Sequence, residues 1–538
     1  MRDYGADMAS HSPPLTSARA PGAMVASADQ LATQAGMAVF AMGGNAVDAA
    51  IATNAAIAVT APHLCGMGGD LFALVHTGNR DGGREVVALN ATGKAGAGSD
   101  AAALRAEGRT EMPFRHDIRS VTVPGCVDGW AQLHEHFARL PMADLLAPAI
   151  QLAEGGFPAS PLLVASLGLA DEPARENLRE LVDQARHPGN RVRRPGAARA
   201  LRAIAEQGRD GFYRGEFGEG LRRLGNGLFS DNDLAKPAAI WTESMCQHAF
   251  GTTIHSMPPN SQGYLLLGAA GLADQLDLPA DPDDPRWAHL LIEAATAAGH
   301  DRPRVLHQDA NGAALVEQII GRLATIDRER ASRKPVPTVD GDTTYLCTVD
   351  HERMGVSLIQ SNASGFGSWL VEPNTQINLH NRGLGFSIEA GHRAELGPGR
   401  RPPHTLTPAL ATNDDGTLAA VFGTMGGDAQ PQILLQVAAR LFLHRQSPAV
   451  AINAGRWALR GPTTGFDTWG TRGGPHVIVE GQAPAVWSSG LRACGHEVDV
   501  TPPYDSGYGH AHAIVVNESD LLVGAADPRA RIGSVAGL

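Results

Sequence analysis

Thr343 stands where this chain could cut itself and expose a nucleophile. The segment before it, residues 328–342, is charged, broken by prolines and without apolar periodicity, which predicts an exposed linker. If the Asp342–Thr343 peptide bond breaks, Thr343 gains a free α-amine, which titrates at about pH 7.7 to 8.0 in model peptides. That amine can act as the general base for the hydroxyl of the same residue. The sequence therefore contains a candidate N-terminal threonine nucleophile.

A predicted β-hairpin would hold Thr343 in place. Residues 343–349 are β-branched, aromatic or apolar, residues 350–353 form a polar turn, and residues 355–361 form a return strand. On local propensity alone, the favoured interpretation of Thr343 is an ordinary residue that opens a strand. Residues outside the hairpin are needed to decide between the two interpretations.

Further elements are predicted on both sides of Thr343. Apolar spacing predicts helices at residues 27–41, 47–59, 263–276, 287–299 and 432–442, and strands at residues 71–76, 86–90 and 253–256. Asn45 and Asp48 are typical of the cap and first-turn acid that open a helix, here the second in that series. Strands become more frequent after Thr343, and helices outside paired strands indicate an α/β sandwich.

Motifs along most of the chain resemble the γ-glutamyltranspeptidase family of N-terminal-nucleophile (Ntn) hydrolases. In chain order they are GMAVFAMGGNAVDAAIATNAAIAVTAPHLCGMGGDLFALVH, TVPGCVDGW, IHSMPPNSQG, DTTYLCTVD, SNASGFGSWLVEP, FGTMGGDAQPQ and GAADPRA. The resemblance implies a four-layer αββα sandwich. It also implies a precursor that cleaves itself before Thr343, giving a large subunit of residues 1–342 and a small catalytic subunit of residues 343–538 in one intertwined globular unit.

The resemblance assigns catalytic roles to three further residues. It places the hydroxyl of Ser361 beside the nucleophile, and it places the backbone amides of Gly426 and Gly427 in an oxyanion hole. Glycine suits that role because no Cβ blocks the approach of a ligand to the backbone. From the residues alone, Ser361 is equally a serine on a strand face, and the glycine pair is equally a tight turn.

The positions that would recognise a γ-glutamyl group differ from the family pattern. Thr92 stands where glutamyl-cleaving members have an arginine for the substrate α-carboxylate, and Gly385 stands where they have an acid for the α-ammonium group. His404 and Thr405 replace the family's serine pair. Hydrogen bonds to charged groups contribute about 1.5–3 kcal/mol each, so γ-glutamyl binding is expected to weaken by several kcal/mol.

Arg382 and His404 instead indicate a pocket for an anionic or polar acyl group. The motifs NRGLGFS, RPPHTLTP and MGGDAQPQ resemble the amidohydrolase branch of the family, which includes oxamate amidohydrolase and cephalosporin-type acylases. We therefore predict hydrolysis of a small amide through an acyl-enzyme on Thr343. The sequence leaves open that Arg382 forms only a structural ion pair and that His404 is a packed loop residue.

Two other functions stay open at this point. One is a true γ-glutamyltransferase or glutathione hydrolase whose amino-acid clamp is rebuilt from other residues. The other is an uncleaved, inactive protein with a binding role. Tyr345, where transpeptidases more often have histidine, bears on how efficiently the chain would cleave itself.

Composition argues against several other classes of protein. The 538 residues are 43% hydrophobic and 19% charged, so the chain can bury a large core. A formal net charge of -12 without a basic run argues against nucleic acid and anionic membrane surfaces as partners. The predicted partners are a small-molecule amide and, after cleavage, the large and small subunits for each other, with a dimer of heterodimers left open.

No cofactor, disulfide or targeting segment is predicted. The 21 histidines show no HExxH or comparable spacing, so neither a metal nor an organic cofactor is expected. The five cysteines are far apart and lack CxxC spacing, so buried free thiols are expected. The N-terminus lacks an apolar signal region, and residues 46–61 are too short and polar to span a bilayer. These features predict a cytoplasmic protein, although many family members are exported or membrane-anchored.

Overall fold

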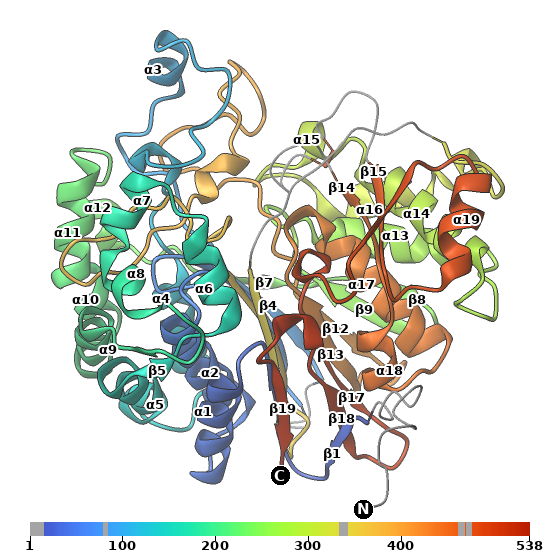
Figure 1. Ribbon diagram of the computed structural model, residues 1–538, viewed down its shortest axis with the longest axis horizontal. Coiled ribbons are helices and arrows are strands. Elements are labelled where there is room, and N and C mark those ends of the chain that lie inside the picture. Colours follow the sequence, from blue (N-terminus) through green and yellow to red (C-terminus); the bar gives the residue numbers. More distant parts are fainter. Residues whose placement is uncertain (1–15, 79–83, 333–342, 461–467, 470–475) are drawn as a thin grey trace, which may run out of the picture.

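Two seven-stranded sheets lie face to face in the computed structural model, which describes residues 16–78, 84–332, 343–460, 468–469 and 476–538 (Figure 1). The first sheet has the order β19 (Ser534–Gly537), β2 (Met24–Ser27), β10 (Thr344–Val349), β11 (Gly355–Ser361), β3 (Asp70–His76), β4 (Val86–Ala91) and β7 (Ile240–Glu243). The second has the order β1 (Ala18–Ala20), β18 (Leu522–Ala525), β17 (Ala511–Val516), β13 (Leu418–Thr424), β12 (Ala409–Thr412), β9 (Thr252–Ser256) and β8 (Met245–Ala249). Neighbouring strands in both sheets are antiparallel.

Helices cover the outer face of each sheet. Blue and teal helices flank the first sheet in Figure 1, and lime and orange helices flank the second. Packed against the first sheet are α1 (Gln30–Ala41), α2 (Ala46–Thr60) and α4 (Cys126–Phe137), and α5 (Met142–Gly155) packs on α2. Packed against the second are α13 (Gly263–Ala273) and α17 (Gln430–Ala438), and α14 (Pro285–Gly299) packs on α13. The predicted four-layer αββα sandwich is confirmed.

The alternation of side chains along β10 separates the layers. Tyr345 and Cys347 belong to the core between the two sheets, whereas Leu346 belongs to the core beneath α2. Successive residues of a strand point to opposite faces, so Thr343 lies on the same face as Tyr345. The candidate nucleophile is therefore directed toward the space between the sheets.

Local sequence explains why α2 begins where it does and why it is buried. The side chain of Asn45 accepts hydrogen bonds from the amides of Val47 and Asp48, and the Asp48 carboxylate accepts from the amide of Asn45. This capping box confirms the predicted helix start. Every residue of α2 is buried, which suits its small apolar side chains.

The other predicted elements agree with the structure to within a few residues. The hairpin predicted at residues 343–361 is formed by β10 and β11. The helix predicted at residues 432–442 is shorter as an α-helix, because it changes to a π-turn over Ala439–Leu443.

Each sheet combines strands that precede Thr343 with strands that follow it. In the first sheet, β10 pairs with β2 and β11 pairs with β3, so the segment after Thr343 lies between two strands that precede it. Asp342 and most of the predicted linker lie outside the described residues, so the division into two subunits stays a prediction. Of the linker segment, residues 328–330 and 332 are exposed.

The cysteine and membrane predictions had different outcomes. All five cysteines are free, but Cys246 is exposed and Cys494 is partly exposed, so the expectation that every thiol is buried was wrong. Cys246 lies on the solvent side of β8, and Cys494 ends a surface helix. Among the described residues, no helix combines the length and apolarity that crossing a bilayer requires.

Buried histidines predict a loss of stability in mild acid. Burial lowers the pKa of His510 to about 4, and that of His404 and His512 to about 3, from an ordinary value of 6.5. The folded protein keeps these rings neutral, whereas the unfolded chain protonates them below about pH 6.5, so their contribution is complete above that pH. Below it, each ring costs up to about 1.4 kcal/mol per pH unit until its folded pKa is reached.

We expect the free energy of unfolding to fall by several kcal/mol between pH 7 and pH 5, measured from urea unfolding curves. His512→Gln should reduce this pH dependence, whereas substitution of the exposed His187 should leave it unchanged. A free energy of unfolding that stays constant over this range would contradict the prediction.

Candidate active site

Thr343 and Ser361 face each other at one end of the first sheet. Thr343 directly precedes β10 and Ser361 ends β11, and the pairing of Thr344 with Gln360 places the two opposite each other. Thr343 Oγ1 and Ser361 Oγ lie 3.0 Å apart, and both residues are buried. The amide of Ala363 donates to Ser361 Oγ at 2.8 Å, which fixes the serine hydroxyl. The structure thus brings together the first two predicted site residues as a hydrogen-bonded hydroxyl pair.

Antiparallel pairing gathers other predicted site residues at this same end of the sandwich. Ser361 pairs with Asp70 at the start of β3, and β4 returns to this end just before Thr92. In the second sheet, β12 begins and β13 ends on this side, which places the loops at residues 401–408 and 425–427 next to each other. The site is therefore built from loops that are far apart in sequence.

Asp70 is the charged centre of these loops. Its Oδ1 accepts hydrogen bonds from the amides of Gly93 (2.9 Å) and Gly125 (3.2 Å). Its Oδ2 lies 3.3 Å from His404 Nε2 and 3.6 Å from His380 Nδ1. Burial raises the pKa of Asp70, but His380, His404 and the backbone donors outweigh burial and bring the pKa below its usual range. Asp70 is therefore a buried carboxylate near neutral pH.

His404 is a fixed link between Asp70 and Arg382. The amide of Leu406 donates to His404 Nδ1 at 3.3 Å, so Nε2 carries the proton and donates to Asp70. Burial, and after it the charge of Arg382, lowers the pKa of His404 to about 3, so the ring is neutral. The ring also stands edge-on to Phe72, with centroids 5.2 Å apart. His404 therefore positions its neighbours, which agrees with the packed-residue interpretation left open by the sequence.

Arg382 brings a buried positive charge to Thr405. Its Nη1 donates to Thr405 Oγ1 at 3.1 Å and lies 3.4 Å from His404 Nδ1. Burial lowers the pKa of Arg382 to about 10, which leaves the guanidinium charged at neutral pH. Nearby, Arg302 pairs with Asp428 at 3.6 Å. Arg382, His404 and Thr405 thus form one group of contacting side chains.

Gly426 and Gly427 form a tight turn between β13 and α17. Their φ angles of +134° and +55° lie in the region that favours glycine. The amide of Ala429 donates to the Gly426 carbonyl at 2.9 Å, and Gln262 Nε2 donates to the Gly427 carbonyl at 3.1 Å. Gln262 also donates to the Thr405 carbonyl at 2.8 Å. One side chain therefore ties the glycine turn to the Arg382 group.

Thr92 lies beside an arginine that sequence reasoning did not find. Arg401 Nη1 donates to Thr92 Oγ1 at 3.2 Å, and the guanidinium also binds the carbonyls of Thr92 and Ala238. Thr92 in turn donates to Asn90 Oδ1 at 2.7 Å. Arg401 thus places a guanidinium beside Thr92, the position where glutamyl-cleaving members of the family have an arginine. Main-chain carbonyls already bind this guanidinium.

Gly385 has no room for an acidic side chain. A Cβ at this position would come within 2.1 Å of the Pro403 carbonyl oxygen and 3.3 Å of Pro402 Cβ. The main chain of the RPPHTLTP motif occupies the space that a carboxylate would need. The structure therefore agrees with the loss of the counter-charge for a substrate ammonium group at this position.

Tyr345 lies in the core between the sheets. Its ring lies against Gly423, where a Cβ would come within 2.1 Å of a ring carbon, and its hydroxyl lies 3.1 Å from Ser357 Oγ. The tyrosine is thus accommodated by a glycine on the facing sheet.

Sequence reasoning missed Asp70, Gln262 and Arg401 as members of the site. Each stands in or directly beside a motif already noted: Asp70 ends GMGGD, Gln262 lies in MPPNSQG, and Arg401 opens RPPHTLTP. The available signal for these site residues was a polar side chain within a glycine- or proline-rich motif. Their contacts could not be predicted, because they join segments up to 334 positions apart.

The whole chain is similar to a known protein family, to curated proteins and to solved structures. The gamma-glutamyltranspeptidase family model matches residues 32–537. The oxamate amidohydrolase proenzyme of Klebsiella pneumoniae is 35% identical over 96% of this chain and 98% of its own length. The glutathione hydrolase-like YwrD proenzyme of Bacillus subtilis is 32% identical over 94% and 97%. The crystal structure of a cephalosporin acylase from Bacillus halodurans, 31% identical, superposes with a TM-score of 0.86 over 100% of this chain and 99% of that chain.

Proposed function

This chain belongs to the gamma-glutamyltranspeptidase family of Ntn hydrolases, and on that premise we propose that it cleaves itself between Asp342 and Thr343 and then hydrolyses a small amide. Family membership makes it an enzyme of the hydrolase and acyltransferase class. The observation that carries the proposal is the 3.0 Å contact between Thr343 Oγ1 and Ser361 Oγ at the head of β10. A hydroxyl so placed can serve both the cut and the later reaction.

Self-cleavage would use the Thr343 hydroxyl before any free amine exists. Its oxygen attacks the carbonyl carbon of Asp342, the C–N bond breaks, and the acyl group moves from nitrogen to oxygen as an ester. The α-amine of Thr343 is released in this shift, as the nitrogen takes up the proton that the hydroxyl loses. Water then hydrolyses the ester, which regenerates the Thr343 hydroxyl and leaves Asp342 with a terminal α-carboxylate. Ser361 supports the attack by holding Thr343 Oγ1 in a hydrogen bond.

Amide hydrolysis then follows from the same residues. The Thr343 amine accepts the hydroxyl proton as the oxygen attacks the substrate carbonyl, and it returns that proton to the leaving amine. The amides of Gly426 and Gly427 stabilise the negative charge that develops on the carbonyl oxygen. Water hydrolyses the acyl-enzyme and regenerates the free hydroxyl. Hydrogen bonds from Ala429 and Gln262 to the carbonyls of Gly426 and Gly427 fix the turn, which supports this role for the glycines.

A small acyl group that carries a carboxylate is the substrate best supported. Arg382 supplies a buried positive charge, and Thr405 lies beside it as a hydroxyl partner. A guanidinium recognises carboxylates through two parallel donors. The similarity to an oxamate amidohydrolase points the same way, because oxamate is an amide whose acyl group bears a carboxylate.

A γ-glutamyl substrate is the second candidate. Arg401, next to Thr92, is the observation that favours it, together with the similarity to a glutathione hydrolase-like protein. Against it stand the two carbonyls that already bind Arg401 and the closed space at Gly385. We rank it second for those reasons.

The two fragments are expected to stay together, since both sheets contain strands from each. Assembly into a dimer of heterodimers and a cytoplasmic location are further proposals that follow from the sequence.

Mass spectrometry and a substrate panel test the proposal. Purified protein should contain two polypeptides, residues 1–342 and 343–538, the second beginning TTYLCTVD. Oxamate should be hydrolysed with a kcat/KM about 100-fold or more above that for a γ-glutamyl anilide. The reason is that the protein lacks the charged residues that would bind the α-carboxylate and the α-ammonium group of the γ-glutamyl moiety. Robust γ-glutamyl release, increased by a dipeptide acceptor, would favour the second candidate. An uncleaved and inactive protein would favour a binding role.

A further inference from the structure

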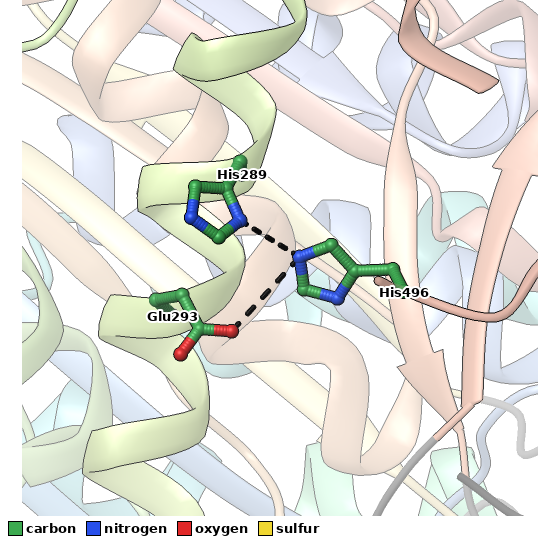
Figure 2. A group of neighbouring side chains, drawn as sticks. All are labelled: His289, Glu293 and His496. Atoms are coloured by element: carbon green, nitrogen blue, oxygen red, sulfur yellow. Dashed lines mark hydrogen bonds and ion pairs between the residues drawn. The ribbon is translucent and has the colours of Figure 1, made fainter. Parts of the chain in front are cut away.

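Three side chains with metal-ligating atoms meet in the helical layer that covers the second sheet (Figure 2). His289 and Glu293 lie one turn apart on α14, and His496 lies between α19 (Ala485–Ala493) and β16 (Val498–Thr501). All three are buried, with exposures of 0%, 3% and 8%. Figure 2 shows the imidazole of His496 directed at both other side chains. The active-site network described above contains none of the three.

The distances suit ligands that share one ion. His289 Nδ1 lies 2.8 Å from His496 Nε2, and His496 Nε2 lies 3.9 Å from Glu293 Oε1. One atom from each residue falls within 4.8 Å of the others. Ligands at about 2.0–2.1 Å from a tetrahedral zinc ion are about 3.3 Å apart, which lies between the two measured separations.

Surrounding contacts already orient two of the ligands. His289 Nε2 lies 3.2 Å from the carbonyl oxygen of Asp327, which can only accept, so Nε2 carries the ring proton and Nδ1 presents a lone pair to the cluster. The amide of Ser332 donates to Glu293 Oε1 at 3.3 Å. A backbone carbonyl on the outer ring nitrogen is the arrangement that commonly supports a metal-bound histidine.

We propose that His289, Glu293 and His496 form a binding site for a divalent transition-metal cation of the zinc class. Two imidazoles and one carboxylate are the donor set that zinc prefers over magnesium or calcium, which take oxygen ligands. Without a metal ion, His496 Nε2 donates a hydrogen bond to His289 Nδ1. Metal binding replaces that hydrogen bond. The ring proton of His496 then moves from Nε2 to Nδ1, so the His496 imidazole stays neutral.

The hydrogen bonds of the cluster leave lone pairs for a cation. Metal ligands must be unprotonated at the binding atom. His289 Nδ1 meets this condition already, because Nε2 holds the ring proton against the Asp327 carbonyl. His496 Nε2 meets it once its proton moves to Nδ1, and Glu293 offers a carboxylate oxygen.

The site would also join the two fragments, a consequence that rests on the proposed self-cleavage. His289 and Glu293 precede Thr343, whereas His496 follows it. A backbone hydrogen bond beside the cluster also joins the two sides, because the amide of Ala331 donates to the carbonyl of Cys494 at 2.8 Å. A bound ion would therefore add a second link between the large and the small fragment.

Titration of chelator-treated full-length protein with Zn²⁺ or Co²⁺ tests the site. Calorimetry should give one equivalent per chain, and Co²⁺ should give the visible absorption of a low-symmetry complex. His289→Gln and His496→Gln should each weaken metal binding about 100-fold or more, because each removes a direct ligand. Loss of a residue that only hydrogen-bonds to a ligand already lowers metal affinity about 10- to 100-fold. His187→Gln, at an exposed histidine, is the matched control and should bind as the wild type does.

Two further measurements separate this site from its alternatives. X-ray absorption of zinc-loaded wild type should show two imidazole ligands, which requires no variant to fold. Thr343→Ala should bind zinc as the wild type does, so failure of self-cleavage and failure of the metal site are distinguishable. Wild-type binding no tighter than that of the histidine variants, or a spectrum without two imidazoles, would overturn the proposal and leave a hydrogen-bonded histidine pair.

Discussion

Thr343→Ala is expected to yield one uncut polypeptide of 538 residues with amide hydrolysis at least about 10⁴-fold below wild type. The substitution removes the hydroxyl that would attack the Asp342 carbonyl, so no amine is released. It also removes the nucleophile of the second reaction. The two losses share one atom, Thr343 Oγ1, which accounts for the size of the effect. Intact-mass spectrometry and an oxamate assay on the same preparation measure both.

Two other variants sharpen this prediction. Thr343→Ser keeps a hydroxyl and, after the cut, an amine, so it should still process and retain measurable activity. Ser361→Ala removes the 3.0 Å partner of Thr343 Oγ1 but keeps the nucleophile itself, so it should slow both steps about 10- to 100-fold without abolishing either. Processing of Thr343→Ala at the wild-type rate would disprove the assignment of the nucleophile.

Arg382→Gln should lower kcat/KM for oxamate about 100-fold and change hydrolysis of an uncharged small amide little. The guanidinium is buried beside Thr405, so its charge acts on the substrate with little screening by water. Hydrogen bonds to charged groups contribute about 1.5–3 kcal/mol each, and 1.4 kcal/mol corresponds to a factor of ten. Steady-state kinetics with the paired substrates measure the difference.

Arg382→Lys is the matched control, since it keeps the charge but loses the planar pair of donors. It should recover part of the oxamate activity. Thermal unfolding must accompany these assays, because Arg382 also lies 3.4 Å from His404 in the buried network around Asp70. Equal losses with charged and uncharged amides would mean that Arg382 supports the fold and does not select the substrate.

Local contacts explain which parts of the site could be anticipated. The resemblance to a known family placed Ser361 beside Thr343, and the two residues lie only 18 positions apart in one hairpin, so a match without gaps could locate both. The start of α2 followed from Asn45 and Asp48, which interact within a single turn. The order of layers followed from motifs that resemble a known family.

Contacts across long sequence separations explain what was missed. Arg401 reaches Thr92 over 309 positions, and Gln262 reaches Gly427 over 165. No periodicity or spacing connects such residues, because the loops that carry them meet only when both sheets have formed. His289 and His496, 207 positions apart, escaped the search for metal motifs for the same reason.

The pairing of strands from the two sides of Thr343 within each sheet has a consequence for renaturation. While the chain is uncleaved, the pairing of β10 with β2 and of β11 with β3 during refolding is intramolecular, so the strands have a high effective concentration for each other. Once the Asp342–Thr343 bond is gone, the same ladders can reform only by a bimolecular encounter of two incomplete pieces, each with unpaired strand edges that favour aggregation. A denatured precursor can therefore recover at any dilution, whereas recovery of the mature enzyme depends on concentration.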